Sequence, residues 1–124
     1  MPETTYTVEL PPGMELLNSN HREHHYRRAR IVKALRTAAK EAAAGLPALD
    51  ALAPVRIIAV VHPHDRRRRD PANWYPSVKA AVDGLVDAGV LQDDDHTRVI
   101  GPDMRLGDVV QGSQLVLHIH PLAE

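Results

Sequence analysis

Residues 65–95 read DRRRRDPANWYPSVKAAVDGLVDAGVLQDDD, and this stretch organises the rest of the chain. Its apolar residues recur at helical spacing, at Val78, Ala81, Val82, Leu85 and Val86. One face of a helix should therefore pack on a sheet. Pro76 is tolerated in a first turn because it has no N–H to donate, and Gly89 suits the left-handed residue after the last turn. We predict a helix from Asn73 or Tyr75 to Ala88.

Carboxylates flank this predicted helix on both sides. Asp70 precedes the N-terminus, where the helix dipole favours acidic groups, and Asp93, Asp94 and Asp95 follow the C-terminus. Magnesium takes one or two carboxylates and completes its shell with waters and substrate phosphates. The pattern therefore indicates a hard-cation site, although each feature alone is more typical of a capping residue or a solvated loop.

The reach of the chain limits which carboxylates can meet. A helix of about 14 residues is roughly 21 Å long, whereas five extended residues from Gly89 to Asp94 return at most about 16 Å. Asp94 should therefore approach the middle of the helix more easily than its start, which makes Asp83 a candidate ligand. Lys79 either stabilises charge on a phosphate or pairs with Asp83 at i+4, and the sequence leaves both open.

The order of these motifs resembles the RusA-type Holliday-junction resolvases, whose core has arginines, D-x-D-N, a lysine, L-D-A-L, A-G and a paired D-D. The matching residues are Arg66 to Arg69, Asp70, Asn73, Lys79, Val82-Asp83-Gly84-Leu85, Ala88-Gly89 and Asp93-Asp94. Two departures matter. The second aspartate of D-x-D-N is Ala72, and Lys79 comes three residues late, after Trp74-Tyr75-Pro76. One metal-ligand position is thus missing.

The resemblance implies a magnesium-dependent endodeoxyribonuclease, with manganese as a possible substitute, that resolves four-way DNA junctions in recombination and repair as a symmetric homodimer. The implied catalytic residues are Asp70, Asp94 and Lys79, and the implied metal ligands are Asp70, Asp94 and Asp93. Reach adds Asp83 to these metal ligands. Two other hypotheses remain open. The chain is a DNA-binding protein that lost cleavage together with the aspartate at Ala72, or it is a scaffold with no nucleic-acid role.

The candidate DNA-binding residues are Arg66, Arg67, Arg68, Arg69, Asn73 and Trp74. Arginine presents a planar fork that binds phosphate in two places, so phosphate binding is the better interpretation of the arginine run. Trp74 at a helix entrance is more often a packed staple than a base-stacking platform. The basic residues of the helix expected before residue 45 are likewise more often a solvated face than a DNA contact.

Composition limits the alternatives. The 124 residues, 44% of them apolar, suffice for a single domain over residues 1–124. The formal net charge of −1 gives no argument for nucleic acid or membrane. Cysteine is absent, which excludes disulfides and thiolate zinc sites. No run of about 18 apolar residues or signal-peptide core is present, so we expect a cytoplasmic protein without a membrane partner.

The remaining elements follow from periodicity. Thr5–Leu10 alternates as a strand, and Arg22 or Glu23 to Ala44 has a helical apolar stripe. Residues 48–53 are expected to add one helical turn. Val55–His62 is almost wholly apolar and is predicted to be a central strand covered on both faces.

The end of the chain is predicted to form a hairpin of 99–110 and 113–121 around Gly112. The resulting order β-α-β-α-β-β predicts an α/β two-layer sandwich, with a mixed sheet of about four strands and helices on one side.

Overall fold

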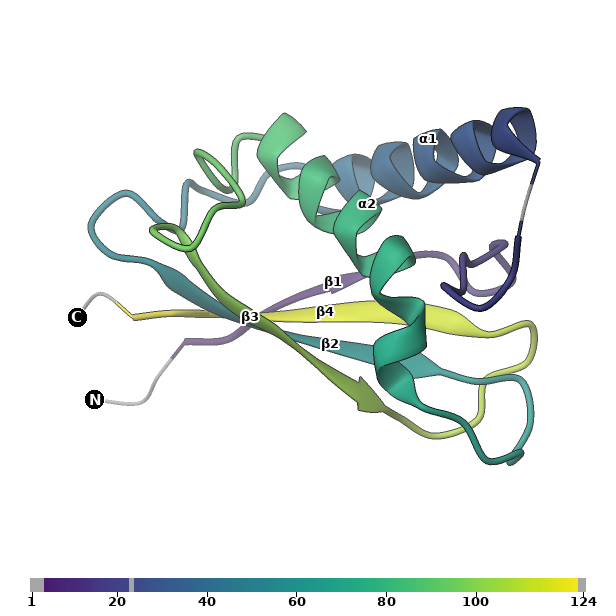
Figure 1. Ribbon diagram of the computed structural model, residues 1–124. Helices are drawn as coiled ribbons and strands as arrows, with labels where there is room; N and C mark the ends of the chain where they lie inside the picture. Colours follow the sequence, from purple (N-terminus) through teal and green to yellow (C-terminus); the bar gives the residue numbers. More distant parts are fainter. Residues whose placement is uncertain (1–3, 23, 123–124) are drawn as a thin grey trace.

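The structure is a computed structural model that describes residues 4–22 and 24–122. A mixed four-stranded sheet carries both long helices on one face (Figure 1). In chain order the elements are β1 (Tyr6–Glu9), α1 (His25–Ala42), β2 (Val55–His62), the 3-10 turn η1 (Pro71–Trp74), α2 (Tyr75–Asp87), β3 (Val99–Leu106) and β4 (Gln114–Pro121). The predicted α/β sandwich is confirmed.

The sheet order is β1-β4-β2-β3, with β4 antiparallel to both β1 and β2 and with β3 parallel to β2. The predicted hairpin of β3 and β4 is therefore wrong, because β2 lies between them. The connecting segment crosses the end of β2, where the N–H of Gly107 donates to Val61 O and that of Val110 donates to Pro63 O, both at 2.9 Å. Strand β2 has backbone partners on both edges, with β3 on one side and β4 on the other.

The two faces of β2 differ, contrary to the prediction of a strand covered on both sides. Val55, Ile57, Ala59 and Val61 are buried on the helix side. On the other side Arg56 is exposed, and Ile58, Val60 and His62 are half-buried. Strand β2 is central, because it is paired on both edges, but the helices cover only one of its faces.

The helices meet closely above the sheet. Ile31, Leu35 and Ala39 of α1 and Val78, Ala81 and Leu85 of α2 belong to the same core. At Gly84 a Cβ would collide with the carbonyl oxygen of Arg36 and lie 2.8 Å from the Cβ of Ala39, so only glycine permits this approach. Arg36 also forms a bidentate ion pair with Asp87 of α2. Its Nε donates to Oδ2 at 2.5 Å and its Nη2 donates to Oδ1 at 2.8 Å.

Element boundaries differ modestly from the predictions. Helix α1 begins at His25 and ends at Ala42, and the alternative start at Glu23 lies outside the described residues. Residues 48–53 lack the expected helical turn and form bends at 49–53, and β3 ends at Leu106. Among the described residues, no helix combines the length and apolarity needed to cross a bilayer.

Candidate functional site

Lys79 joins α2 to the acidic loop, which we define as residues 91–98. Its Nζ donates to Oδ1 of Asp83 at 2.8 Å, one helical turn along α2, and it also contacts the Asp94 carboxylate. The chain after Gly89 therefore returns alongside the body of α2, as its reach predicted. Two carboxylates from different segments converge on one cation.

The charges of this cluster reinforce one another. The hydrogen bonds from Lys79 hold the pKa of the Asp94 carboxyl below its usual value, against a smaller opposing effect of burial. Asp83 and Asp94 in turn raise the pKa of the Lys79 ammonium above its ordinary value. Both Lys79 and Asp94 are therefore charged at neutral pH.

Hydrogen bonds within the acidic loop fix its shape. Oδ1 of Asp93 accepts from the N–H of Asp94 at 2.7 Å, and Oδ1 of Asp95 accepts from the N–H of Thr97 at 2.9 Å. The bonds from Thr97 lower the pKa of Asp95. Asp95 thus caps the turn that leads into β3, whereas the Asp93 side chain is exposed.

The loop is tied to the preceding segment through Asp50, which sequence reasoning missed. Its fully buried side chain accepts the N–H of Gln92 at 2.9 Å, and its backbone oxygen accepts from Arg98 at 3.1 Å. The second carboxylate oxygen has no hydrogen-bond partner among the described residues. No spacing in residues 45–54 distinguishes Asp50 from a solvated turn aspartate, so the sequence carries no signal for this role.

Asp70 takes part in a local capping contact at the start of η1. Its Oδ1 accepts the N–H of Ala72 at 3.0 Å and caps η1, which is the capping role that its position before Pro71 also allowed. Across 4–22 and 24–122 no hydrogen bond or ion pair joins Asp70 to Asp94. No three acidic or histidine side chains within that part of the chain are grouped so that they could hold a metal ion.

The four arginines after β2 divide into two kinds. Arg66, Arg67 and Arg68 are exposed. Arg69 instead points inward, with Nη1 and Nη2 donating to the backbone oxygen and Oδ1 of Asp65, both at 2.8 Å. Only 11% of its side chain is exposed. Bonds from the Arg67 backbone N–H and from the Arg69 side chain lower the pKa of Asp65, so Arg69 closes the loop that presents the other three arginines.

Trp74 and Asn73 have structural contacts at the start of α2. Trp74 is half-buried against the core, and the Arg69 guanidinium lies over its ring at 6.0 Å from the centroid. The backbone oxygen of Asn73 accepts the N–H of Ser19 at 2.7 Å. The interpretation of Trp74 as a packed staple therefore describes its place better than an exposed stacking platform.

A buried serine attaches the N-terminal loop to the same region. Ser77 Oγ accepts the N–H of Leu17 at 2.6 Å and donates to the Leu17 oxygen at 2.9 Å. Together with the bond between Ser19 and Asn73, these bonds hold the loop before α1 against η1 and the first turn of α2.

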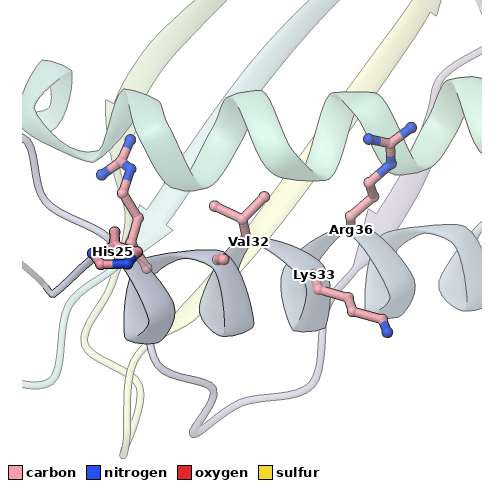
Figure 2. Close-up of a pocket in the computed structure, with 6 residues that line it drawn as sticks. His25, Val32, Lys33 and Arg36 are labelled. Atoms are coloured by element: carbon pink, nitrogen blue, oxygen red, sulfur yellow. The ribbon is translucent and has the colours of Figure 1, made fainter.

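A shallow groove runs along α1. It is lined by His25, Arg28, Ala29, Val32, Lys33 and Arg36. Figure 2 shows Val32 and Arg36 directed toward the neighbouring helix and Lys33 directed away from it. Since Arg36 is occupied by Asp87 and Arg27 by Glu15, part of the basic character of α1 is neutralised within the protein.

Comparison with known protein families gives no match to this chain, and no curated protein matches it.

Proposed function

We propose that this protein is a magnesium-dependent, structure-selective endodeoxyribonuclease that acts on four-way DNA junctions. The observation that carries the proposal is the convergence of Asp83 and Asp94 on Lys79, one turn into the helix that the exposed arginine loop precedes. The resemblance of residues 66–94 to the RusA-type core supports the same activity.

Asp83 and Asp94 are the residues that would hold the metal, with Asp70 and Asp93 as further candidates. Carboxylate oxygens are the donors that Mg²⁺ prefers, and two suffice when water and substrate phosphate complete the shell. The donor set fits the ion in type, because both side chains present carboxylate oxygens from neighbouring segments. When bound, Mg²⁺ would supply an activated water and neutralise charge on the scissile phosphate.

The remaining chemistry belongs to side chains of this chain. Lys79 has three N–H donors, of which Asp83 and Asp94 use two, so the third is available to a phosphate oxygen. The flanking phosphates of the DNA would be bound by Arg66, Arg67 and Arg68. Such contacts give affinity without reading the base sequence. Arg69 is left out of this group because Asp65 holds it.

A second candidate function is a junction-binding protein that does not cleave. It is favoured by Ala72, which stands where the resembled motif has an aspartate and contributes only its N–H to Asp70. The arginine loop would still bind DNA, whereas cleavage would be absent. A scaffold without a nucleic-acid role would leave the exposed arginines without a ligand.

A cleavage assay separates these functions. A synthetic four-way junction and a linear duplex with the same arm sequences would be incubated with the protein across a Mg²⁺ and Mn²⁺ titration. We expect paired nicks in the junction, none in the duplex and none without metal. Calorimetry of the DNA-free protein would report metal binding separately. Junction binding without nicks would favour the non-catalytic protein, and no binding even at low salt would favour the scaffold.

A further inference from the structure

Strands β2 and β3 run parallel, so their carboxyl ends lie at the same end of the sheet (Figure 1). In open α/β sheets the crevice beyond the carboxyl ends is the usual place for a ligand, because the connecting segments diverge there. An open cavity of about 450 Å³ lies at this point. One wall is Pro63 with residues 65–67, after β2, and the other is residues 106–109, at the end of β3. We call it the strand-end cavity.

The wall at the end of β3 is held in place by contacts with β2. His62 Nδ1 lies 2.8 Å from the backbone oxygen of Asp108, and it must donate this bond because a carbonyl only accepts. Gly107 approaches the same imidazole so closely that a Cβ would lie 2.5 Å from its Cε1. Together with the backbone bonds of Gly107 and Val110, these contacts preform the wall. A ligand therefore does not have to order it on binding.

The wall after β2 presents two guanidinium groups. Asp65 is already engaged within the loop, since its Oδ1 accepts from the Arg69 side chain at 2.8 Å and from the Arg67 N–H at 3.0 Å. The Arg67 side chain is 80% exposed, and its Nε lies 3.9 Å from Asp65. Arg66 is exposed as well. Both guanidiniums thus present N–H donors in the fork that suits a phosphate.

The opposite wall has a different chemistry. Leu106 and Val109 are 40% and 42% exposed, which places two large apolar side chains at the cavity. The Asp108 side chain between them in sequence is exposed, and its carboxylate has no partner among the described residues. A phosphate ion alone would gain nothing from the apolar side chains and would be repelled by the carboxylate. The cavity therefore suits a ligand with an anionic end and a flat, apolar end that carries an N–H donor.

We infer that the strand-end cavity binds a single nucleotide through both walls. Arg66 and Arg67 bind its phosphate. Leu106 and Val109 contact the base, and the Asp108 carboxylate accepts an N–H from the exocyclic amino group of adenine, cytosine or guanine. Thymine lacks that group and has carbonyl oxygens on either side of its N3–H, so it should bind more weakly.

The nucleotide comes from one of two sources, because a free nucleotide and an unpaired nucleotide in DNA share this chemistry. The inference rests on the proposed function only for the second source. Binding itself requires neither metal nor cleavage. The volume of the cavity lies within the usual range for small-molecule sites, although its openness to solvent implies a weak, millimolar affinity for a free nucleotide.

Amide NMR of the full chain without metal would test the site, during titration with each of the four deoxynucleoside monophosphates to about 10 mM. We expect the amides of residues 106–109 to shift. Thymidine monophosphate should bind at least about fivefold more weakly than the other three, which is the effect of losing one hydrogen bond. Inorganic phosphate and the unphosphorylated nucleosides are the controls for the two halves of the ligand, and each should bind more weakly than the nucleotide.

Variants assign the two walls separately. Arg66→Ala with Arg67→Ala should weaken all four nucleotides alike. Asp108→Asn should remove the discrimination against thymidine monophosphate, because an amide can also donate to a base carbonyl. Val109→Ser should weaken the nucleotides without changing the binding of inorganic phosphate. Its matched control is Leu52→Ser, since Leu52 is 86% exposed and precedes β2 at the other end of that strand.

A duplex with one unpaired nucleotide, compared with its fully paired counterpart by fluorescence polarisation in EDTA, separates the two sources. A preference for the unpaired nucleotide that Val109→Ser removes supports the site with DNA as the source. Mononucleotide binding without that preference supports the site with free nucleotides as the source. An absence of shifts at residues 106–109, or the same shifts with inorganic phosphate alone, overturns the inference. Because these measurements use neither metal nor cleavage, such a failure is distinct from a failure of the proposed nuclease.

Discussion

Oδ2 of Asp50 accepts the backbone N–H of Gln92 at 2.9 Å, although the two residues lie 42 positions apart. Gln92 directly precedes Asp93 and Asp94, so this bond sets where the acidic loop starts. Removing the buried Asp50 side chain leaves the Gln92 N–H without this acceptor.

Asp50→Ala should therefore destabilise the protein by about 1 kcal/mol, the usual net contribution of one hydrogen bond. Hydrogen exchange at the Gln92 amide should accelerate more than at amides of β2. The matched control is Asp108→Ala, since that side chain is exposed and should shift stability by less than about 0.5 kcal/mol. Equal effects of the two substitutions would contradict the anchoring role.

The carboxylates near Lys79 should differ from other acidic residues in a cleavage assay. If the proposed nuclease is active, Asp94→Asn and Asp83→Asn should each abolish junction cleavage or lower it at least a hundredfold, while junction binding stays equal or tightens because a negative group is lost near phosphate. Asp70→Asn tests the ligand position implied by the resemblance, where Asp70 caps η1 in this structure.

Asp103→Asn, on the opposite face of the sheet, is the control for charge and should cleave normally. Full activity of Asp94→Asn would contradict the metal assignment. Full activity of Asp83→Asn alone would mean that Asp83 serves only as the helix partner of Lys79.

Periodicity predicted the helices and most strands, because burial on one face repeats with the pitch of each element. It did not predict that β2 separates β3 from β4, since a strand pattern encodes which face is buried and says nothing about its neighbour. Likewise, four consecutive arginines look equivalent in sequence. Arg69 differs because its guanidinium bonds Asp65, four residues earlier, and lies over the Trp74 ring.

The ion pairs of Lys79 should give stability a defined pH dependence. The folded pKa of Asp94 is depressed, so its contribution is present above the unfolded value of about 3.9 and is lost as pH falls through the folded value. The folded pKa of Lys79 is raised, so its contribution is present below about 10.4 and is lost as pH rises through the folded value.

Lys79→Met should therefore lower the free energy of unfolding by about 0.5 kcal/mol between these limits, a small amount because 46% of the Lys79 side chain is exposed. The difference from wild type should shrink below about pH 4. Urea denaturation across pH measures it, with Lys33→Met on α1 as the control. If the stability difference between wild type and Lys79→Met grew as the pH fell, that result would contradict stabilisation by this ion pair.

The arginine loop should bind phosphate through counterion release. Replacing Arg67 and Arg68 with alanine should weaken binding to junctions and duplexes alike, and should reduce the slope of log K against log salt by about one unit per lost contact. Arg30→Ala with Lys33→Ala removes the same charge from α1 and serves as the control. If the slope is unchanged in the loop variant, the arginines are a solvated charge run.

Ala72 decides between the two nucleic-acid functions. It is exposed in η1, so an aspartate fits there without disturbing the core, two residues from Asp70. If the wild type binds junctions without cleaving them, Ala72→Asp should restore cleavage or at least raise Mg²⁺ affinity measured by calorimetry, because it supplies the carboxylate that the resembled motif contains.

If the wild type already cleaves, Ala72→Asp should change the rate little, since Asp83 supplies the oxygen near Asp94. Ala72→Asn, equal in size but neutral, separates charge from shape in both cases. An inactive wild type that neither binds metal nor cleaves after Ala72→Asp would show that the missing aspartate is not the cause of its inactivity. The Lys79 cluster would then be an ion-pair network that fixes the acidic loop against α2.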